Sequence, residues 1–176
     1  MYRRAFYPGR FQPFHLGHLQ AVKYILSRSQ EVVIGVTAAQ FNYLKDNPFT
    51  AGERIEMIRL ALEDLWSKVY VIPIENVPNN YEWVTHVESL TPSFDAVFTN
   101  NELVKMLFRK HGYQVEPIPW VRAEEFSGKH VRKVIAEEGE WENLVPERVA
   151  RYIKEVEGDK RIRDLFKSEE IRLPMR

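Results

Sequence analysis

The chain has 176 residues, of which 44% are hydrophobic and 28% charged, and its 25 Lys and Arg balance its 25 Asp and Glu. This composition is typical of a globular protein and excludes a disordered or fibrous chain. Zero net charge disfavours a protein that binds nucleic acid or anionic membranes. The absence of Cys excludes disulfides, thiolate nucleophiles and Cys-ligated metal sites.

The N-terminal segment and the apolar runs favour a cytoplasmic protein. Pro8 and Gly9 follow too soon after Met1 for a signal-peptide core, and the longest apolar stretch, at residues 32–36, is much shorter than a membrane span. We therefore expect a cytoplasmic protein without a membrane segment. The length favours a single domain over residues 1–176.

Short β-like runs alternate with helical patterns along the chain. An apolar and aromatic run at residues 3–8 predicts a first strand. Apolar residues at helical spacing predict a helix over 16–29. β-Branched and apolar residues at 31–37 are typical of a strand that is buried on both faces. A polar loop over 38–49 follows.

A capping signal predicts where the next helix begins. Thr50 and Glu53 have the spacing of a capping box, in which each side chain accepts a hydrogen bond from the other residue's backbone N–H. The helix that they open carries four apolar residues at helical spacing, Ile55, Ile58, Leu62 and Leu65. A third strand is predicted at residues 69–74.

The remaining chain repeats the alternation. We expect helices at Trp83–Leu90 and 102–111 and strands at 95–99 and 113–118. A helix with Ser127 as its N-cap is predicted over 127–137. Pro146 fits the first position of a later helix that runs to a stop at Gly158, and a charged helical tail from Asp159 frays at Pro174.

Strands that alternate with helices indicate βαβ units and a parallel sheet. We predict an α/β fold: a Rossmann-like, doubly wound parallel sheet of about five strands with flanking helices and a helical C-terminal region from about residue 127. Ligands of such sheets bind at the carboxyl ends of the strands. The loops that follow the strands are therefore where functional residues are expected.

The loop after the first predicted strand carries the strongest functional signal and reads GRFQPFHLGH. Gly9 permits a tight turn, and Gly17 lets a ligand approach the backbone. His15 and His18 share one face at the start of a helix, where free N–H groups attract anions. Arg10 adds a planar guanidinium that suits phosphate. The pattern predicts a phosphate site whose imidazoles stabilise charge on a phosphoryl group.

The string from Gly9 to His18 resembles the signature of the nucleotidylyltransferase superfamily with the His-x-Gly-His motif, and it is similar to archaeal-type nicotinamide mononucleotide (NMN) adenylyltransferases. The resemblance continues through PFTAGER, Trp83, Ser127-Gly128 and the Pro146 region. It implies adenylyl transfer from ATP to NMN, which yields NAD and pyrophosphate. The alternatives are transfer of AMP or CMP to another phosphorylated acceptor, or a non-catalytic sensor of NAD or ATP.

A second phosphate site is predicted at the start of the helix over 127–137. Ser127 can cap this helix, Gly128 exposes backbone N–H groups, and Arg132 lies about one turn from the N-terminus. The superfamily has a motif here that contacts the ATP phosphates, and Lys129 stands where that motif has Thr. Lys129 either adds positive charge to the triphosphate site or points to water.

Pattern and resemblance together define the predicted site. The expected catalytic residues are His15, His18, Arg10 and Arg132. The residues expected to bind ATP and its phosphates are Gly9, Phe11, Gly17, Ser127, Gly128, Lys129 and Asn101. The residues expected to bind NMN are Trp83, Asn80, Thr37 and Gln40. Trp83 either stacks on the pyridinium ring or packs in the core, and the residues after the second and fourth strands are either contacts or turns.

The phosphate of NMN would arrive largely deprotonated, so the reaction requires no general base. We expect no protein metal cluster and a Mg²⁺ ion held mainly by the ATP phosphates. The expected partners are the small molecules ATP, NMN and NAD, without nucleic acid or membrane. A homo-oligomer is expected from the resemblance alone.

Overall fold

The computed structural model describes residues 1–119 and 122–168. Its centre is a five-stranded sheet in the order β3-β2-β1-β4-β5, in which every pair of neighbours is parallel. The strands are β1 (Tyr2–Gly9), β2 (Ser29–Val36), β3 (Val69–Pro73), β4 (Ala96–Phe98) and β5 (Gln114–Glu116). The predicted Rossmann-like, doubly wound sheet is confirmed, and each expected strand is present with slightly shifted ends.

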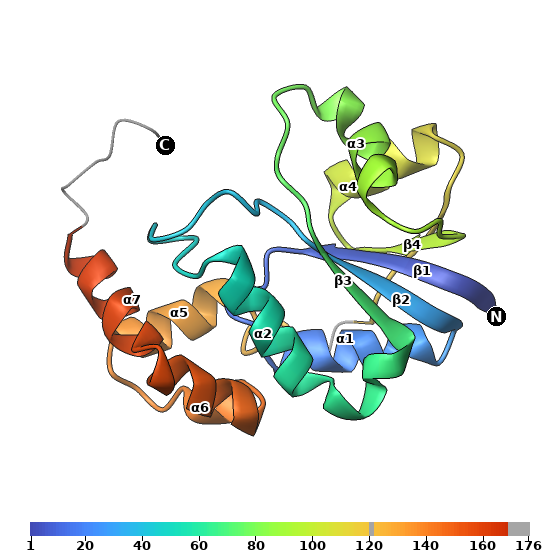
Figure 1. Cartoon of the computed structure of the whole chain (residues 1–176). Helices are drawn as coiled ribbons and strands as arrows, with labels where there is room; N and C mark the ends of the chain where they lie inside the picture. Colours follow the sequence, from blue (N-terminus) through green and yellow to red (C-terminus); the bar gives the residue numbers. More distant parts are fainter. Residues whose placement is uncertain (120–121, 169–176) are drawn as a thin grey trace.

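Helices cover both faces of the sheet (Figure 1). One face carries α1 (Leu16–Leu26) and α2 (Ala51–Ala61), and the other carries α3 (Trp83–Leu90) and α4 (Glu102–Lys110). The C-terminal helices are α5 (Gly128–Ala136), α6 (Glu147–Glu155) and α7 (Gly158–Lys167), and they pack beside α2. Short 3-10 turns occur at η1 (Glu63–Lys68), η2 (Asn80–Glu82) and η3 (Glu142–Leu144).

The alternation of side chains along the central strands divides the core into two clusters. Tyr7 and Ile34 face α1, α2 and the C-terminal helices, whereas their neighbours Phe6 and Val33 face α3 and α4. Successive residues of a strand point to opposite faces, so a strand covered on both sides must be apolar throughout. Burying a Val, Ile or Phe side chain completely contributes about 1.5–3 kcal/mol to the stability of the fold. This core holds in place the sheet whose strand carboxyl ends carry the site.

Two predicted helix ends were wrong. The first helix ends at Leu26, and Ser29 begins β2, where its hydroxyl donates to the Ile25 carbonyl at 2.8 Å. The second helix ends at Ala61, so Leu62 and Leu65 lie beyond it, although both still contact the core. In the second case the apolar spacing continued past the helix because the following turn packs on the same core.

The C-terminal stop was also misplaced. Pro146 is the N-cap of α6 rather than its first residue, and α6 ends at Glu155. The chain changes direction between α6 and α7 at Glu157, which has a φ of 55°, and Gly158 begins α7. A Cβ on Gly158 would lie 2.6 Å from the Phe49 ring, so this glycine serves close packing and not helix termination. The expected fraying at Pro174 lies outside the described residues.

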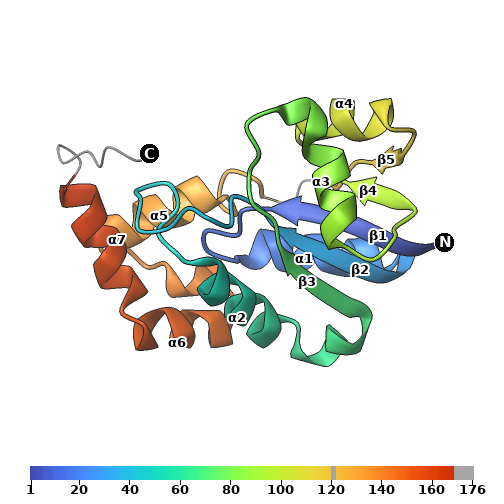
Figure 2. The ribbon, with the colours of Figure 1, turned by 45° about the horizontal axis from the view of Figure 1, so that its top comes forward.

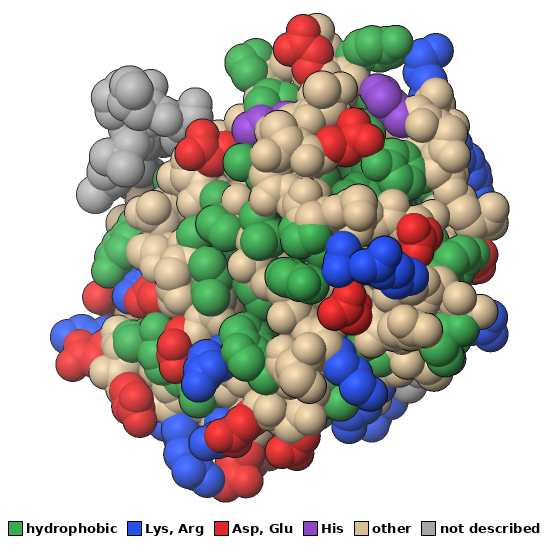
Figure 3. All heavy atoms as spheres, turned by 45° about the vertical axis from the view of Figure 1, so that its right-hand side comes forward, with side chains coloured by type: hydrophobic (Ala, Val, Ile, Leu, Met, Phe, Trp, Pro, Cys, Tyr) green, Lys and Arg blue, Asp and Glu red, His purple; other side chains and the backbone are tan. Residues whose placement is uncertain are grey.

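Within residues 1–119 and 122–168, no helix has the length and apolar character needed to cross a membrane. On the face drawn in Figure 3, basic and acidic side chains are interspersed, and neither sign forms a continuous patch there. This distribution agrees with the balanced charge of the whole sequence.

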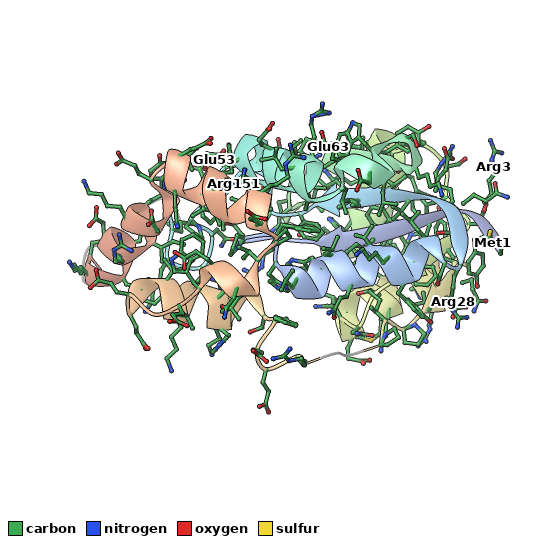
Figure 4. All side chains as sticks on the ribbon, turned by 90° about the horizontal axis from the view of Figure 1, so that it is seen from below. Met1, Arg3, Arg28, Glu53, Glu63 and Arg151 are labelled. Atoms are coloured by element: carbon green, nitrogen blue, oxygen red, sulfur yellow. The ribbon has the colours of Figure 1, made fainter. Side chains whose placement is uncertain are left out.

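An ion pair joins α7 to the start of α2. Arg161 donates to both carboxylate oxygens of Glu53, at 2.6 and 2.8 Å, and its guanidinium lies 4.2 Å from the centre of the Tyr43 ring. The predicted capping box of Thr50 and Glu53 is also present. Figure 4 shows Glu53 near the C-terminal helices, at the end of the sheet opposite to Met1.

Burial raises the pKa of the Glu53 carboxyl, but hydrogen bonds from the Arg161 guanidinium and the Thr50 backbone outweigh it, and the net pKa is lowered. A carboxyl with a lowered pKa in the folded state stabilises the protein above its unfolded pKa, and this contribution is lost as the pH falls through the folded pKa.

We expect Glu53→Gln to lower the free energy of unfolding at pH 7 by about 2 kcal/mol, because it leaves a partly buried guanidinium without its counter-ion. Urea denaturation measures this loss, which should shrink as the pH falls below the ordinary range of a Glu carboxyl. The control is Glu147→Gln, since Glu147 pairs with Arg151 on the surface. That change should cost less than about 0.5 kcal/mol. Equal losses in the two variants would contradict the anchoring role of Glu53.

Candidate active site

Two cavities lie side by side at the carboxyl ends of the strands, with volumes of about 470 and 300 Å³. Both are lined by Pro8 at the end of β1 and Thr99 directly after β4. β1 and β4 are neighbours in the sheet but not in the sequence, so the chain changes direction of winding between them. This is the position at which doubly wound sheets bind ligands, and Figure 2 shows the strands ending on the side of α5.

The larger cavity, here the Trp83 cavity, combines a flat aromatic side chain with polar groups. Trp83 comes from the start of α3 and lines this cavity, and its indole also packs edge-on against the buried Phe108. The other lining residues are Pro8, Gly9, Arg10, Thr37, Asn76, Val77, Asn80, Thr99, Asn101, Leu103, Val104 and Leu107. Arg10 is the single charged residue among these described residues.

The smaller cavity, here the histidine cavity, contains the two motif histidines. It is lined by Tyr7, Pro8, His15, Gly17, His18, Gln20, Ala21, Thr99, Asn100, Ile118, Pro119, Ala123, Phe126, Ser127 and Gly128. The loop after β5 forms its far wall, where the Asn100 side chain exchanges two hydrogen bonds with the Ile118 backbone at 2.8 and 3.0 Å. The structure thus brings the two predicted phosphate motifs to one cavity.

His15 and His18 form a reciprocal capping box at the start of α1. The Nδ1 atom of His15 accepts from the backbone N–H groups of Gly17 and His18, at 3.1 and 3.4 Å. The Nδ1 atom of His18 accepts from the His15 N–H at 3.1 Å. The rings stack, with centroids 3.6 Å apart. Because both Nδ1 atoms are acceptors, each neutral ring carries its proton on Nε2 and can donate it to a ligand.

The surroundings keep both imidazoles neutral. Burial, together with the positive charge of Arg132, lowers the pKa of His15 from 6.5 to about 3. Burial and the adjacent His15 ring lower the pKa of His18 well below its ordinary value. An imidazole that stays neutral keeps a fixed Nε2–H donor over the physiological pH range.

The N-termini of α1 and α5 approach each other beside these rings. A Cβ on Gly17 would lie 3.0 Å from the Phe126 carbonyl oxygen, which leaves no room for a side chain. Ser127 is the N-cap of α5, as predicted, and its hydroxyl accepts from the His130 N–H at 3.1 Å. Two helix N-termini with their N–H groups at one cavity favour a ligand that carries several negative charges.

Two arginines add positive charge. Arg132 is buried and donates to the Gln12 carbonyl at 2.9 Å. Its guanidinium occupies space that is free because Gly128 has no side chain, since a Cβ there would lie 2.8 Å from Nη1. Burial and the charge of Arg10 lower the pKa of Arg132, while Asp46 opposes this effect. Arg10 is exposed and lines the Trp83 cavity. Arg10 thus brings positive charge to the Trp83 cavity, whereas Arg132 lines neither cavity.

Four predicted contact residues have other surroundings. The Phe11 ring is buried against Tyr7, Phe14 and His18, so Phe11 can meet a ligand only through its backbone. Lys129 is exposed, at the second position of α5, and lines neither cavity.

Gln40 also lines neither cavity, because its amide exchanges two hydrogen bonds with the Asn76 backbone at 3.0 and 3.2 Å. Asn101 was predicted on the ATP side but lines the Trp83 cavity, where it caps α4. Loop side chains after neighbouring strands point to either side of the sheet, which sequence spacing does not specify.

The sequence reasoning missed three residues that shape the site. Gln12 is buried, and its amide pairs with the backbone of Phe49 at 2.8 and 3.0 Å, which ties the loop after β1 to the start of α2. Arg54 is fully buried and bonds the loops after β1 and β2. Asn76 follows β3 and lines the Trp83 cavity. Its position shortly after a predicted strand was the one sequence signal that could have identified it as a site residue.

The family model described as "Cytidylyltransferase-like" matches residues 6–134. Among curated proteins, the nicotinamide-nucleotide adenylyltransferase of Methanolobus tindarius is 47% identical over 167 residues, which are 95% of this chain and 96% of the relative. The protein of the same name from Pyrobaculum aerophilum is 49% identical over 166 residues, with coverages of 92% and 93%.

A solved structure with the same fold is a bifunctional NMN adenylyltransferase/ADP ribose pyrophosphatase from Francisella tularensis, with a TM-score of 0.78 and 19% identity. The match covers 97% of this chain but only 54% of that longer one. A second structure of that protein, complexed with AMP and a manganese ion, superposes equally well. At this identity the likeness concerns the fold alone.

We expect His15 and His18 to keep the neutral Nε2–H tautomer at pH 5, because burial opposes their protonation. Long-range ¹H–¹⁵N spectra of the rings report protonation and tautomer directly. The same protein unfolded in urea is the control, since its histidines should titrate near 6.5. An imidazolium pattern for either ring in the folded protein at pH 5 would contradict the geometry.

Proposed function

Because the chain belongs to the cytidylyltransferase-like family, we propose that it is a nicotinamide-nucleotide adenylyltransferase, which transfers AMP from ATP to NMN and forms NAD and pyrophosphate. The observation that carries this proposal is the pair of cavities that meet at Pro8 and Thr99. NAD consists of two nucleotides joined through their phosphates, so its synthesis needs two nucleotide cavities that meet where the phosphates join.

ATP is assigned to the histidine cavity. The N-termini of α1 and α5 and the Nε2–H groups of His15 and His18 offer donors to its phosphates. The loops after β4 and β5, which are joined by the hydrogen bond between Asn100 and Ile118, supply the wall for the adenosine. Ser127, Gly128 and Gly17 contribute backbone at the phosphate end of the cavity.

NMN is assigned to the Trp83 cavity. The indole of Trp83 provides a face on which the cationic pyridinium ring stacks, and cation–π contacts of this kind contribute about 0.5–2 kcal/mol. The exposed amides of Asn76 and Asn80 lie at the same cavity and can pair with the carboxamide. Gly9, Arg10 and Thr37 lie at the carboxyl ends of β1 and β2, where the NMN phosphate would meet ATP.

In the reaction, a phosphate oxygen of NMN attacks the α-phosphorus of ATP. A new P–O bond forms while the bond from the α-phosphorus to the bridging oxygen breaks, and pyrophosphate leaves with the electron pair. The second pKa of a phosphate monoester is about 6, so the nucleophile is largely deprotonated at neutral pH and no general base is needed. Catalysis then consists of positioning and charge stabilisation.

The neutral histidines suit this task. His15 and His18 donate from Nε2 to oxygens on which charge accumulates in the transition state, without first losing a proton. Arg10 stabilises the phosphates at the junction. Arg132 contributes positive potential from its buried position. Lys129, which is exposed on α5, would add positive charge on the side of the leaving pyrophosphate.

We assign Mg²⁺ as the ion that neutralises phosphate charge, held mainly by the ATP phosphates and water. Among the described residues, no group of three or more His, Cys, Asp or Glu is placed to bind a metal ion. Assembly into a homo-oligomer belongs to the same proposal.

The activity test combines the purified protein with ATP, NMN and Mg²⁺ and follows NAD through an alcohol dehydrogenase that reduces it to NADH. Appearance of NADH supports the proposal. ATP binding without NAD formation would contradict it, and a screen of other phosphorylated acceptors for pyrophosphate release would follow.

We expect His18→Ala to lower kcat by about 10²–10³-fold, because one donor to the transition state is lost. The free energy of unfolding should fall by only about 1 kcal/mol, the usual cost of a lost helix cap. The control is His111→Ala, which removes a histidine at the end of α4 that lines neither cavity, and its kcat should match that of the wild type. A loss of activity that merely tracks the loss of folded protein would refute the role of His18.

The acceptor should be the amide form of the nucleotide. Arg10 is the single charged residue among the described lining residues of the Trp83 cavity, and the proposal places it at the phosphate. The carboxylate of nicotinic acid mononucleotide would be desolvated there without a cation. We expect kcat/KM to be at least about tenfold higher for NMN. Equal values from the coupled assay with both acceptors would contradict this assignment of the cavity.

A further inference from the structure

Arg54 is the largest side chain that is fully buried in the described structure. It lies in the first turns of α2, and all five of its N–H donors reach backbone carbonyl oxygens. The acceptors are Arg10 and Thr37 at 2.9 and 2.8 Å from Nη1, Ala38 and Phe41 at 3.2 and 3.5 Å from Nη2, and Thr50 at 3.2 Å from Nε.

The charge of Arg54 has no counter-ion among the described residues, since its five acceptors are neutral carbonyls. Burial, reinforced by the nearby charge of Arg10, lowers the pKa of Arg54 to about 10, so the guanidinium remains charged at neutral pH. A buried cation without a counter-ion is costly. Binding of an anion nearby would offset this cost.

Two of the five residues whose carbonyl groups bind Arg54 line the Trp83 cavity. Arg10 and Thr37 line that cavity, and they follow the two central strands β1 and β2. Phe11 and Ala38, the residues next to them, have left-handed backbones with φ of 54° and 50°. Such conformations are unfavourable for residues other than glycine and persist only where the surroundings hold them. Arg54 therefore holds both turns.

We propose that Arg54 is a positioning residue for the phosphate of the acceptor nucleotide. It fixes the two turns that carry Arg10 and Thr37, and its own positive charge, buried next to these turns, is partly compensated when the phosphate binds. The inference rests on the proposed function, because that function places a nucleotide phosphate at this position. Arg54 itself is buried behind the turns and does not touch the substrate.

The test measures the affinities of two ligands that differ only by the phosphate. Titration calorimetry would give Kd for NMN and for nicotinamide riboside, its nucleoside, with the wild type and with Arg54→Gln. We expect Arg54→Gln to weaken NMN binding at least about tenfold, equivalent to about 1.4 kcal/mol. Riboside binding should change by less than about threefold, because Trp83 and the asparagines remain. A parallel loss for both ligands would show a general disturbance of the cavity and would overturn the proposal.

Three further variants sharpen the result. Arg54→Lys keeps the charge but has fewer donors, so its loss for NMN should lie between those of the wild type and Arg54→Gln. Arg59→Gln is the matched control, an identical change on the exposed side of the same helix, where Arg59 stacks on Trp66. It should leave both affinities unchanged. Losses from Arg10→Gln and Arg54→Gln should combine less than additively, since Arg54 acts through Arg10.

Folding is tested separately. If Arg54→Gln fails to fold, the comparison rests on Arg54→Lys, for which a selective loss of NMN supports the proposal and a parallel loss refutes it. If neither variant folds, Arg54 serves folding and the proposal is overturned. A wild type that forms no NAD would instead refute the proposed function, so the two failures are distinguishable.

Discussion

The site depends on one constraint: the loop after β1 must be held rigid although it belongs to no helix or strand. Three buried polar side chains hold it through backbone atoms. Gln12 within the loop pairs with Phe49, Arg132 donates to the Gln12 carbonyl, and Arg54 donates to the Arg10 carbonyl. Buried backbone groups need such partners, and the partners here come from three parts of the chain. The loop, α2 and α5 are thereby joined where the cavities meet.

The same arrangement separates the roles of the charged and neutral groups. Burial keeps the histidines that line the histidine cavity neutral, and their Nε2–H groups are available as donors because both Nδ1 atoms accept backbone N–H groups. The positive charge is supplied mainly by arginines, two of which are buried. A guanidinium stays charged on burial where an imidazole does not. The site therefore offers fixed donors and a positive potential at neutral pH without depending on a titrating group.

The sequence predicted much of the architecture for identifiable reasons. Apolar and β-branched runs located all five strands, and the cap signals at Thr50 and Ser127 placed two helix starts correctly. The errors lie at ends: at Ser29 and Gly158, residues taken as helix stops belong to the next element. Ser and Gly are compatible with the end of one element and with the start of the next, so residue type alone does not locate a helix end.

Motif spacing placed His15 and His18 at a helix start and predicted a phosphate site there, because both properties follow from local geometry. The nucleotide was implied by the family resemblance. The tertiary structure decided which loop residues line a cavity and which cavity they line: Asn101 lines the Trp83 cavity, and Gln40 lines neither. It also decided the protonation of the histidines and the role of Arg54, which depend on burial and on partners far along the chain. Local sequence sets which groups are available, whereas long-range packing sets their environment and direction.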